Sequence, residues 1–232
     1  MKRSNRSTML CAALCALIPL TTAHTEELKI DRSTRAFKEA EDSLTRSTQL
    51  YKTISEGKLG KVPQSILDKT KCVAIFPDTM TMAAGVGGTH GDGVGFCKAS
   101  DGTWSNPMFL NLIGGSLGLQ AGVKSADMVL YLTGDKAAEA LKQGTFKLGG
   151  ELSAVAGTFD KTYVPTQAEV VAYHRTEGLF AGAALDGISI SRDESDERAF
   201  YGTREAVLTE KIPGDLEREV NELRNVLPAH VG

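Results

Sequence analysis

The chain has 232 residues, of which 41% are hydrophobic and 24% charged, as in an ordinary globular protein of one or two domains. Its formal net charge of −3 and isoelectric point near 5.9 differ from the basic character of most nucleic-acid-binding domains, so no nucleic-acid partner is expected. The 24 glycines form no low-complexity repeat, so we expect them inside structured segments.

The first 23 residues have the pattern of a secretory signal peptide. Three basic residues precede an apolar run over 9–20, which is too short to span a bilayer as a helix. Small residues then lead to Ala23, so we expect cleavage there and export to the periplasm or cell envelope, with an uncleaved anchor as the alternative. Acylation of Cys11 or Cys15 is not favoured, because each follows a leucine instead of a small residue.

Cys72 and Cys97 are the only cysteines that follow the predicted cleavage site. In an oxidising compartment they can form a disulfide, which would close a loop of roughly 25 residues and contribute on the order of 3 kcal/mol. Two buried free thiols are the alternative. No histidine lies near either cysteine in the sequence, so a zinc site is not expected.

Residues 24–57 contain the first predicted helix. Apolar residues recur every seven positions at Ile30, Phe37, Leu44 and Tyr51, which gives one apolar stripe on an otherwise polar helix. Such a stripe indicates docking on a protein core more often than contact with a membrane.

Four lysines follow this helix with few acidic residues between them: Lys58, Lys61, Lys69 and Lys71. Clustered cations beside an amphipathic helix are typical of sequences that contact anionic lipid head groups. A solvated, charged connector is the alternative interpretation of the same residues.

Glycine-rich strands are predicted next. Residues 72–76 form an apolar run, and the glycines at 90–93 predict the turn of a hairpin. In the central stretch 109–124, large apolar residues alternate with small or polar ones from Leu117 to Val123, as in a strand with one packed face. Its four glycines indicate either a tightly curved, barrel-like sheet or a glycine-lined surface that accepts a lipid or partner.

The remainder of the chain mixes short strands and helices without a Pro/Ser-rich linker, which indicates one folded unit after the signal peptide. The predicted elements are strands over 128–133, 146–159, 170–174 and 188–191, helices over 136–143 and after Pro213, and a charged loop over 192–198. The predicted fold class is α+β, with a curved, mostly antiparallel sheet packed by N- and C-terminal helices.

The sequence carries neither a metalloprotease nor a calcium-loop signature. It has no His-Glu-x-x-His or EF-hand pattern, and neither His90 nor His174 has a partner at a recognisable spacing. We therefore expect no catalytic residues, no metal and no cofactor, with an enzyme kept only as a minor alternative.

Several short motifs resemble, in their order and spacing, the SYLF domain family, which includes yeast actin-binding and animal phosphoinositide-binding members. The motifs are KCVAIFP at 71–77, GDGV at 91–94, WSNPMF at 104–109, GGSLGLQAG at 114–122, DMVL at 127–130, FKLGG at 146–150, GLFAG at 178–182, LDG at 185–187 and YG at 201–202. They divide the chain into a SYLF-like domain over 58–204, the preceding helix over 24–57, and a C-terminal helix and tail over 205–232.

The resemblance implies lipid binding and a curved antiparallel sheet packed by helices. In an exported protein of bacterial type, the expected ligand is anionic phospholipid. Because family members are thought to contact membranes through basic sequence near the N-terminal end, Lys58, Lys61, Lys69 and Lys71 are the implied lipid-binding residues. An actin partner is not carried over to an exported chain. A structural or protein-interaction module of the envelope is the alternative function.

Overall fold

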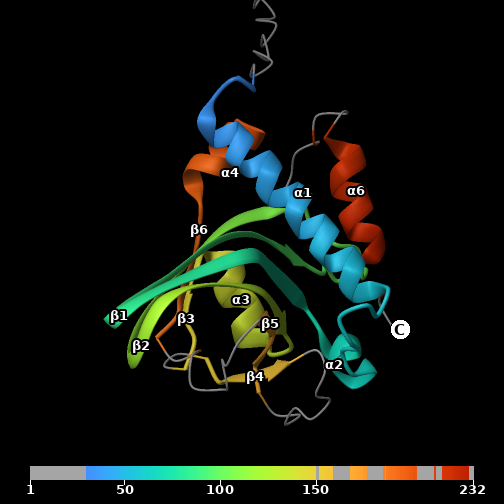
Figure 1. Cartoon of the computed structure of the whole chain (residues 1–232). Coiled ribbons are helices and arrows are strands. Elements are labelled where there is room, and N and C mark those ends of the chain that lie inside the picture. The colour runs from blue at the N-terminus through green and yellow to red at the C-terminus, as the bar shows by residue number, and fades with distance from the viewer. Residues whose placement is uncertain are drawn as a thin grey trace, which may run out of the picture.

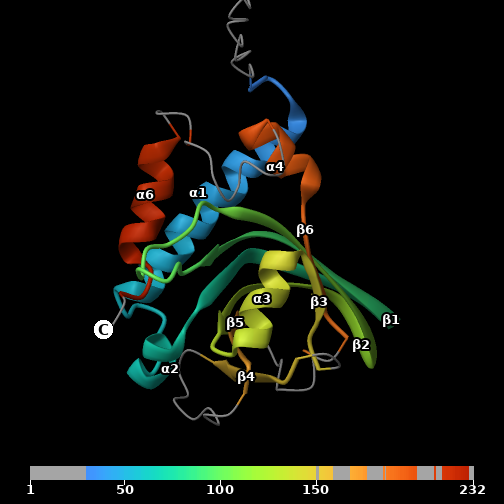
Figure 2. The same ribbon diagram turned by 180° about the vertical axis from the view of Figure 1, so that it is seen from behind.

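The computed structural model describes residues 30–149, 152–158, 168–176, 185, 187–202, 212 and 216–229. In this part of the chain a curled sheet carries α1, α4 and α6 on its convex side and holds α3 on its concave side (Figures 1 and 2). The predicted signal peptide lies outside the described residues. No helix within them is both long and apolar enough to cross a bilayer.

Helix α1 (Arg35–Ser55) begins at Thr34, whose hydroxyl accepts a hydrogen bond from the Phe37 backbone N–H at 3.2 Å. Its stripe of Phe37, Leu44 and Tyr51 is buried, so the predicted face docks on the protein core. The helix ends just before Gly57, whose φ of +71° favours glycine.

Strands β1 (Cys72–Cys97) and β2 (Met108–Leu132) each double back on themselves (Figure 1). In β1 the hydroxyls of Thr81 and Thr89 lie 2.9 Å apart. The β1–β2 register shifts between Ala84 and Val86, which marks the bend between a first arm (72–84) and a second arm (86–97). The predicted turn at 90–93 is therefore wrong, because these residues lie within the second arm and pair with residues 110–113 of β2.

The remaining strands extend the sheet from β2. On one side β6 (Ser189–Arg192) pairs with residues 110–113 of β2, and β3 (Thr145–Lys147) pairs with β6. On the other side β5 (Val170–Thr176) pairs with residues 126–132 of β2, and β4 (Ala154–Thr158) runs parallel to β5. Every pairing between these strands except β4–β5 is antiparallel, so the predicted α+β class with a curved, mostly antiparallel sheet is confirmed.

Two glycines in the second arm of β1 permit the close approach of its first arm. A Cβ atom built on Gly93 would lie 2.2 Å from the Ile75 carbonyl oxygen, and one on Gly91 would lie 2.9 Å from the Thr79 hydroxyl. These contacts explain part of the glycine content, since any side chain there would push the two arms apart.

The other helices are α2 (Gln64–Lys69), α3 (Asp135–Gln143), α4 (Glu194–Tyr201) and α6 (Glu217–Val226). The charged loop predicted over 192–198 is wrong, because α4 begins there. A carboxylate oxygen of Asp193 accepts from the backbone N–H groups of Ser195 and Asp196 and caps the helix. Arg192 and Glu197 form a buried pair through two 2.7 Å hydrogen bonds.

Aromatic side chains join the convex helices to the sheet. The ring of Phe200 on α4 lies 6.1 Å from Phe37 of α1 and 5.0 Å from Phe109 of β2. Under the C-terminal half of α1, the centre of the Tyr131 ring of β2 lies 6.5 Å from that of Tyr51 and 5.8 Å from that of Tyr173. The core is therefore continuous along the convex face from α4 to the C-terminal end of α1.

Candidate binding site: a lysine-lined cleft

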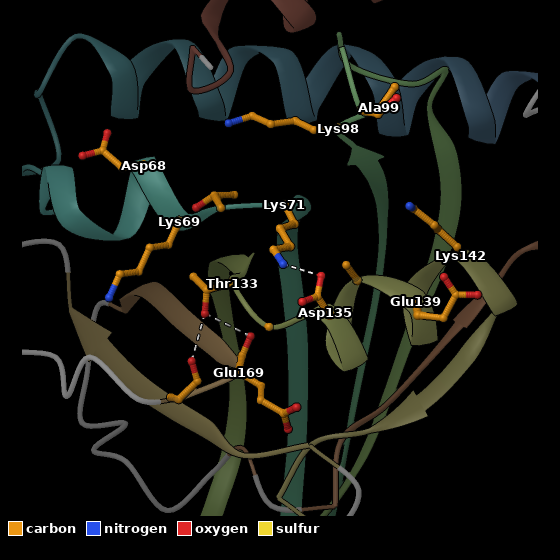
Figure 3. A pocket seen from close by; sticks show the side chains of 15 residues that line it. Asp68, Lys69, Lys71, Lys98, Ala99, Thr133, Asp135, Glu139, Lys142 and Glu169 are labelled. Atoms are coloured by element: carbon orange, nitrogen blue, oxygen red, sulfur yellow. Dashed lines mark hydrogen bonds and ion pairs between the residues drawn. The ribbon is translucent and has the colours of Figure 1, made fainter. Parts of the chain in front are cut away.

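A cleft of about 770 Å³ opens between α2, the ends of β1 and helix α3 (Figure 3). Its charged lining residues comprise lysines and carboxylates in equal number: Lys69, Lys71, Lys98 and Lys142, and Asp68, Asp135, Glu139 and Glu169.

The doubling-back of β1 brings Lys71 and Lys98 together although they are far apart in sequence. The Lys98 backbone N–H donates to the Lys71 carbonyl oxygen at 2.7 Å, and the Lys71 N–H donates to the Leu132 carbonyl at 2.8 Å. The adjacent residues Cys72 and Cys97 have their sulfur atoms at the bonding distance of 2.06 Å, as the predicted disulfide requires. One side of the cleft is thus built on the cross-linked root of the β1 hairpin.

Lys98 is the most constrained of these lysines. Its ammonium lies 4.9 Å from the centre of the Trp104 ring and 3.4 Å from the Ala229 carbonyl oxygen. Burial lowers the pKa of Lys98 from its ordinary value, and the negative charge of Asp68 partly opposes that shift. A second anion beside this ammonium would, like Asp68, favour its charged form and oppose the shift.

Each carboxylate of the cleft already accepts a hydrogen bond from a protein donor. The pairs are Asp68 with the Gln64 amide at 2.8 Å, Asp135 with the Lys71 ammonium, Glu139 with the Gln143 amide at 3.0 Å, and Glu169 with the Ser153 N–H at 3.3 Å. Within the described residues, by contrast, Lys69, Lys98 and Lys142 form no ion pair with a carboxylate. The donors left available in the cleft are therefore cationic.

The structure divides the four lysines predicted to bind lipid. Lys69 and Lys71 line the cleft, whereas Lys58 forms an ion pair with Glu56 at 2.5 Å. Lys61 lines a separate pocket of about 410 Å³ between α2 and the C-terminal ends of α1 and α6. Sequence reasoning missed Lys98 and Lys142. Lys142 lies near the end of the helix predicted over 136–143 and Lys98 directly follows β1, and no local pattern shows that these two positions meet.

Ligands for a metal ion do not gather in the described part of the chain. No group of three or more His, Cys, Asp or Glu side chains is arranged there to hold one. Of the two histidines considered as catalytic candidates, His174 is buried in β5 and His90 is exposed, with its Nε2 3.4 Å from an Asp92 oxygen.

The structure is thus an α+β domain with a curled sheet and a lysine-lined cleft, and comparison with known proteins identifies its family. The family model of Ysc84, described as Las17-binding protein actin regulator, matches residues 113–230. The chain belongs to this family, so the predicted SYLF resemblance is confirmed.

Three relatives illustrate the similarity. The chain is 31% identical over 151 residues to Protein YSC84 of Saccharomyces cerevisiae, with 61% of this chain and 32% of that protein covered. It is 31% identical over 163 residues to LAS seventeen-binding protein 3 of the same species (65% and 35%). It is 30% identical over 148 residues to human SH3 domain-containing YSC84-like protein 1 (60% and 42%).

These matches span about a third to two fifths of each relative's length. The name of LAS seventeen-binding protein 3 and the description of the family both refer to binding of another protein. No solved structure matches the chain.

Proposed function

We propose that this protein binds anionic phospholipid at the bacterial cell envelope, without catalysis, and that the lysine-lined cleft receives the phosphate group. The observation that carries this proposal is the asymmetry of the cleft. All four carboxylates already have donors, whereas Lys69, Lys98 and Lys142 form no ion pair in the described residues. A phosphate supplies the anionic acceptor that these ammonium groups lack within the described residues, where Lys98 donates to the neutral carbonyl oxygen of Ala229.

The expected affinity is modest. Each lysine close to an anionic membrane contributes about 1 kcal/mol, and the carboxylates of the same cleft offset part of that attraction. Because the lysines are partly exposed, salt should weaken binding over the range in which the Debye length falls to about 8 Å.

Liposome co-sedimentation of residues 24–232 tests the proposal. The wild-type protein should sediment with anionic vesicles, sediment poorly with neutral ones, and be released by salt. The Lys69→Glu/Lys142→Glu variant should lose this binding. The Lys58→Glu/Lys61→Glu variant is the matched control, because it makes the same charge change outside the cleft.

Equally negligible binding of the wild-type protein to both kinds of vesicle would refute the lipid function. If the control variant lost as much binding as the cleft variant, the function would stand but its assignment to the cleft would be wrong. Export is tested separately by fractionating cells that produce the full chain, where the proposal requires a shortened protein in the envelope fraction.

A further inference from the structure

Near their bends, β1 and β2 expose apolar side chains that the lipid proposal does not use. In the described part of the chain, the exposed large hydrophobic residues are Met80, Met82, Ile113 and Val123, with exposed fractions of 42%, 56%, 58% and 65%. Single exposed apolar residues are ordinary on protein surfaces, but a group of them on neighbouring strands marks an interaction site.

These four residues form one surface, which we call the convex apolar patch. Met82 is directly opposite Val123 in the register, and Met80 lies two residues before Met82 on the same face. Thr81 lies between Met80 and Met82, and Thr89 is adjacent to His90. The two threonine hydroxyls meet on one face of the sheet, so Met80, Met82 and His90 lie on the other face.

Ile113 joins the same face. It is opposite His90 and four residues after Phe109, whose ring packs against Phe200 of α4 on the convex side. The convex apolar patch therefore continues the face that the helices cover, at a position where helix coverage has ended (Figure 1).

Carboxylates lie beside this patch. Asp92 is two residues from His90 on the patch face and is the exposed carboxylate there. Asp78, two residues before Met80, is already paired with Arg46 at 2.9 Å and adds little negative charge. Asn111, opposite Asp92, donates to the Asp193 carboxylate at 2.7 Å. The crowding of negative charge is also seen at Asp196, whose pKa is raised to about 7 by burial first and then by the charges of Asp193, Glu39 and Asp92.

The hairpin ends themselves carry no charge. Neither the residues 79–89 of β1 nor the residues 112–123 of β2 include a Lys, Arg, Asp or Glu. An uncharged apolar centre beside a charged rim is the usual anatomy of a protein–protein interface. A carboxylate rim repels an anionic bilayer and attracts a cationic partner, so the charge pattern decides between these two occupants.

We propose that the convex apolar patch docks a protein partner whose apolar side chains are flanked by Lys and Arg residues. This goes beyond phospholipid binding and uses a different part of the molecule. The lysine-lined cleft lies at the two ends of β1, whereas the convex apolar patch lies near its bend. The patch supplies the buried centre of the contact, and Asp92 with its neighbouring carboxylates supplies the charge complementarity.

A synthetic probe pair tests this partner chemistry. The probe is an 18-residue amphipathic helix of Leu and Lys, and its control replaces every Lys with Glu. Fluorescence anisotropy should show saturable binding of the Lys peptide to residues 24–232 and none of the Glu peptide. The Met82→Ser/Val123→Ser variant should weaken binding at least tenfold, and Asp92→Asn should weaken it severalfold and reduce its salt dependence.

The lipid assay separates this proposal from the previous one. Lys69→Glu/Lys142→Glu should leave peptide binding unchanged, and Met82→Ser/Val123→Ser should leave vesicle binding unchanged. The docking proposal is overturned if both peptides bind alike or if the patch variant binds the Lys peptide as wild type does. It is also overturned if the patch variant loses vesicle binding, which would make the patch a membrane contact. The same holds if the wild type is a dimer that this variant dissociates, because the occupant would then be a second copy.

Discussion

Replacing Gly93 by alanine should destabilise the protein severely. The added Cβ would lie 2.2 Å from the Ile75 carbonyl oxygen and 2.6 Å from Cδ1 of Phe76, where ordinary contacts begin near 3.4 Å. The first of these atoms belongs to the backbone of the neighbouring arm, so a rotamer change cannot relieve the contact. Overpacking a well-packed site costs roughly 1–3 kcal/mol, and we expect Gly93→Ala to reach about 3 kcal/mol.

Gly115→Ala is the matched control, since a Cβ there would meet nothing within 4 Å. Neither glycine has a positive φ, so the pair compares available space and not backbone conformation. Because glycine inside a strand is less favourable than alanine, the control should be neutral or more stable by about 0.5 kcal/mol. Urea unfolding followed by circular dichroism gives both free energies. A Gly93→Ala protein within 0.5 kcal/mol of wild type would refute the close approach of the two β1 arms.

Two further predictions concern the root of β1 and the start of α4. Cys72→Ala/Cys97→Ala should lower the free energy of unfolding by about 3 kcal/mol, because the disulfide closes a loop with a sequence separation of 25. Titration of the denatured, unreduced wild-type mature protein should find no free thiol, and two free thiols would contradict the bond. The folded-state pKa of Asp196 is raised to about 7, so the folded protein retains that proton and loses stability as pH rises from about 4 to 7. Asp196→Asn should remove this decline and raise the free energy of unfolding at pH 8 by as much as about 4 kcal/mol. Parallel urea-stability profiles of wild type and variant between pH 5 and 8 would contradict it.

The positions of α1, α3 and α6 could be predicted from the sequence because their signals are local. The sevenfold spacing of Phe37, Leu44 and Tyr51 is sufficient to define the buried face of α1, whatever the rest of the chain does. The path of β1 could not be predicted in the same way. The glycines at 91 and 93 look like turn residues, yet their role is to let one arm lie against another, which depends on residues more than ten positions away.

The charged segment at the start of α4 shows a second limit of prediction from the sequence. A run of charged residues such as 192–198 is typical of solvated surface, but the side chains of Arg192 and Glu197 are 7% and 0% exposed and bind each other through two hydrogen bonds. Burial of such a pair is compatible with the fold only when both charges are matched. The sequence shows that Arg192 and Glu197 are present, but only the tertiary structure shows that they are buried and bind each other.

The candidate site was predictable only where it coincides with a run of sequence. Lys69 and Lys71 belong to one short segment, and the resemblance pointed to it. Lys98 and Lys142 reach the same cleft through the β1 hairpin and through α3, so their contribution depends on tertiary structure.

The doubling-back of β1 also explains how one small domain can present two unlike surfaces. Its root brings Lys71 and Lys98 together at the cleft, while its bend carries Met82 to the far end of the sheet. Asp78 is seven residues after Lys71 and Asp92 is six residues before Lys98, so about 20 Å of extended strand separates each carboxylate from the nearer lysine. This exceeds the Debye length of about 8 Å at physiological salt, so the lysines of the cleft have little electrostatic effect on the carboxylates beside the patch. One surface can therefore bind an anion and the other a cationic partner in a chain whose formal net charge is only −3.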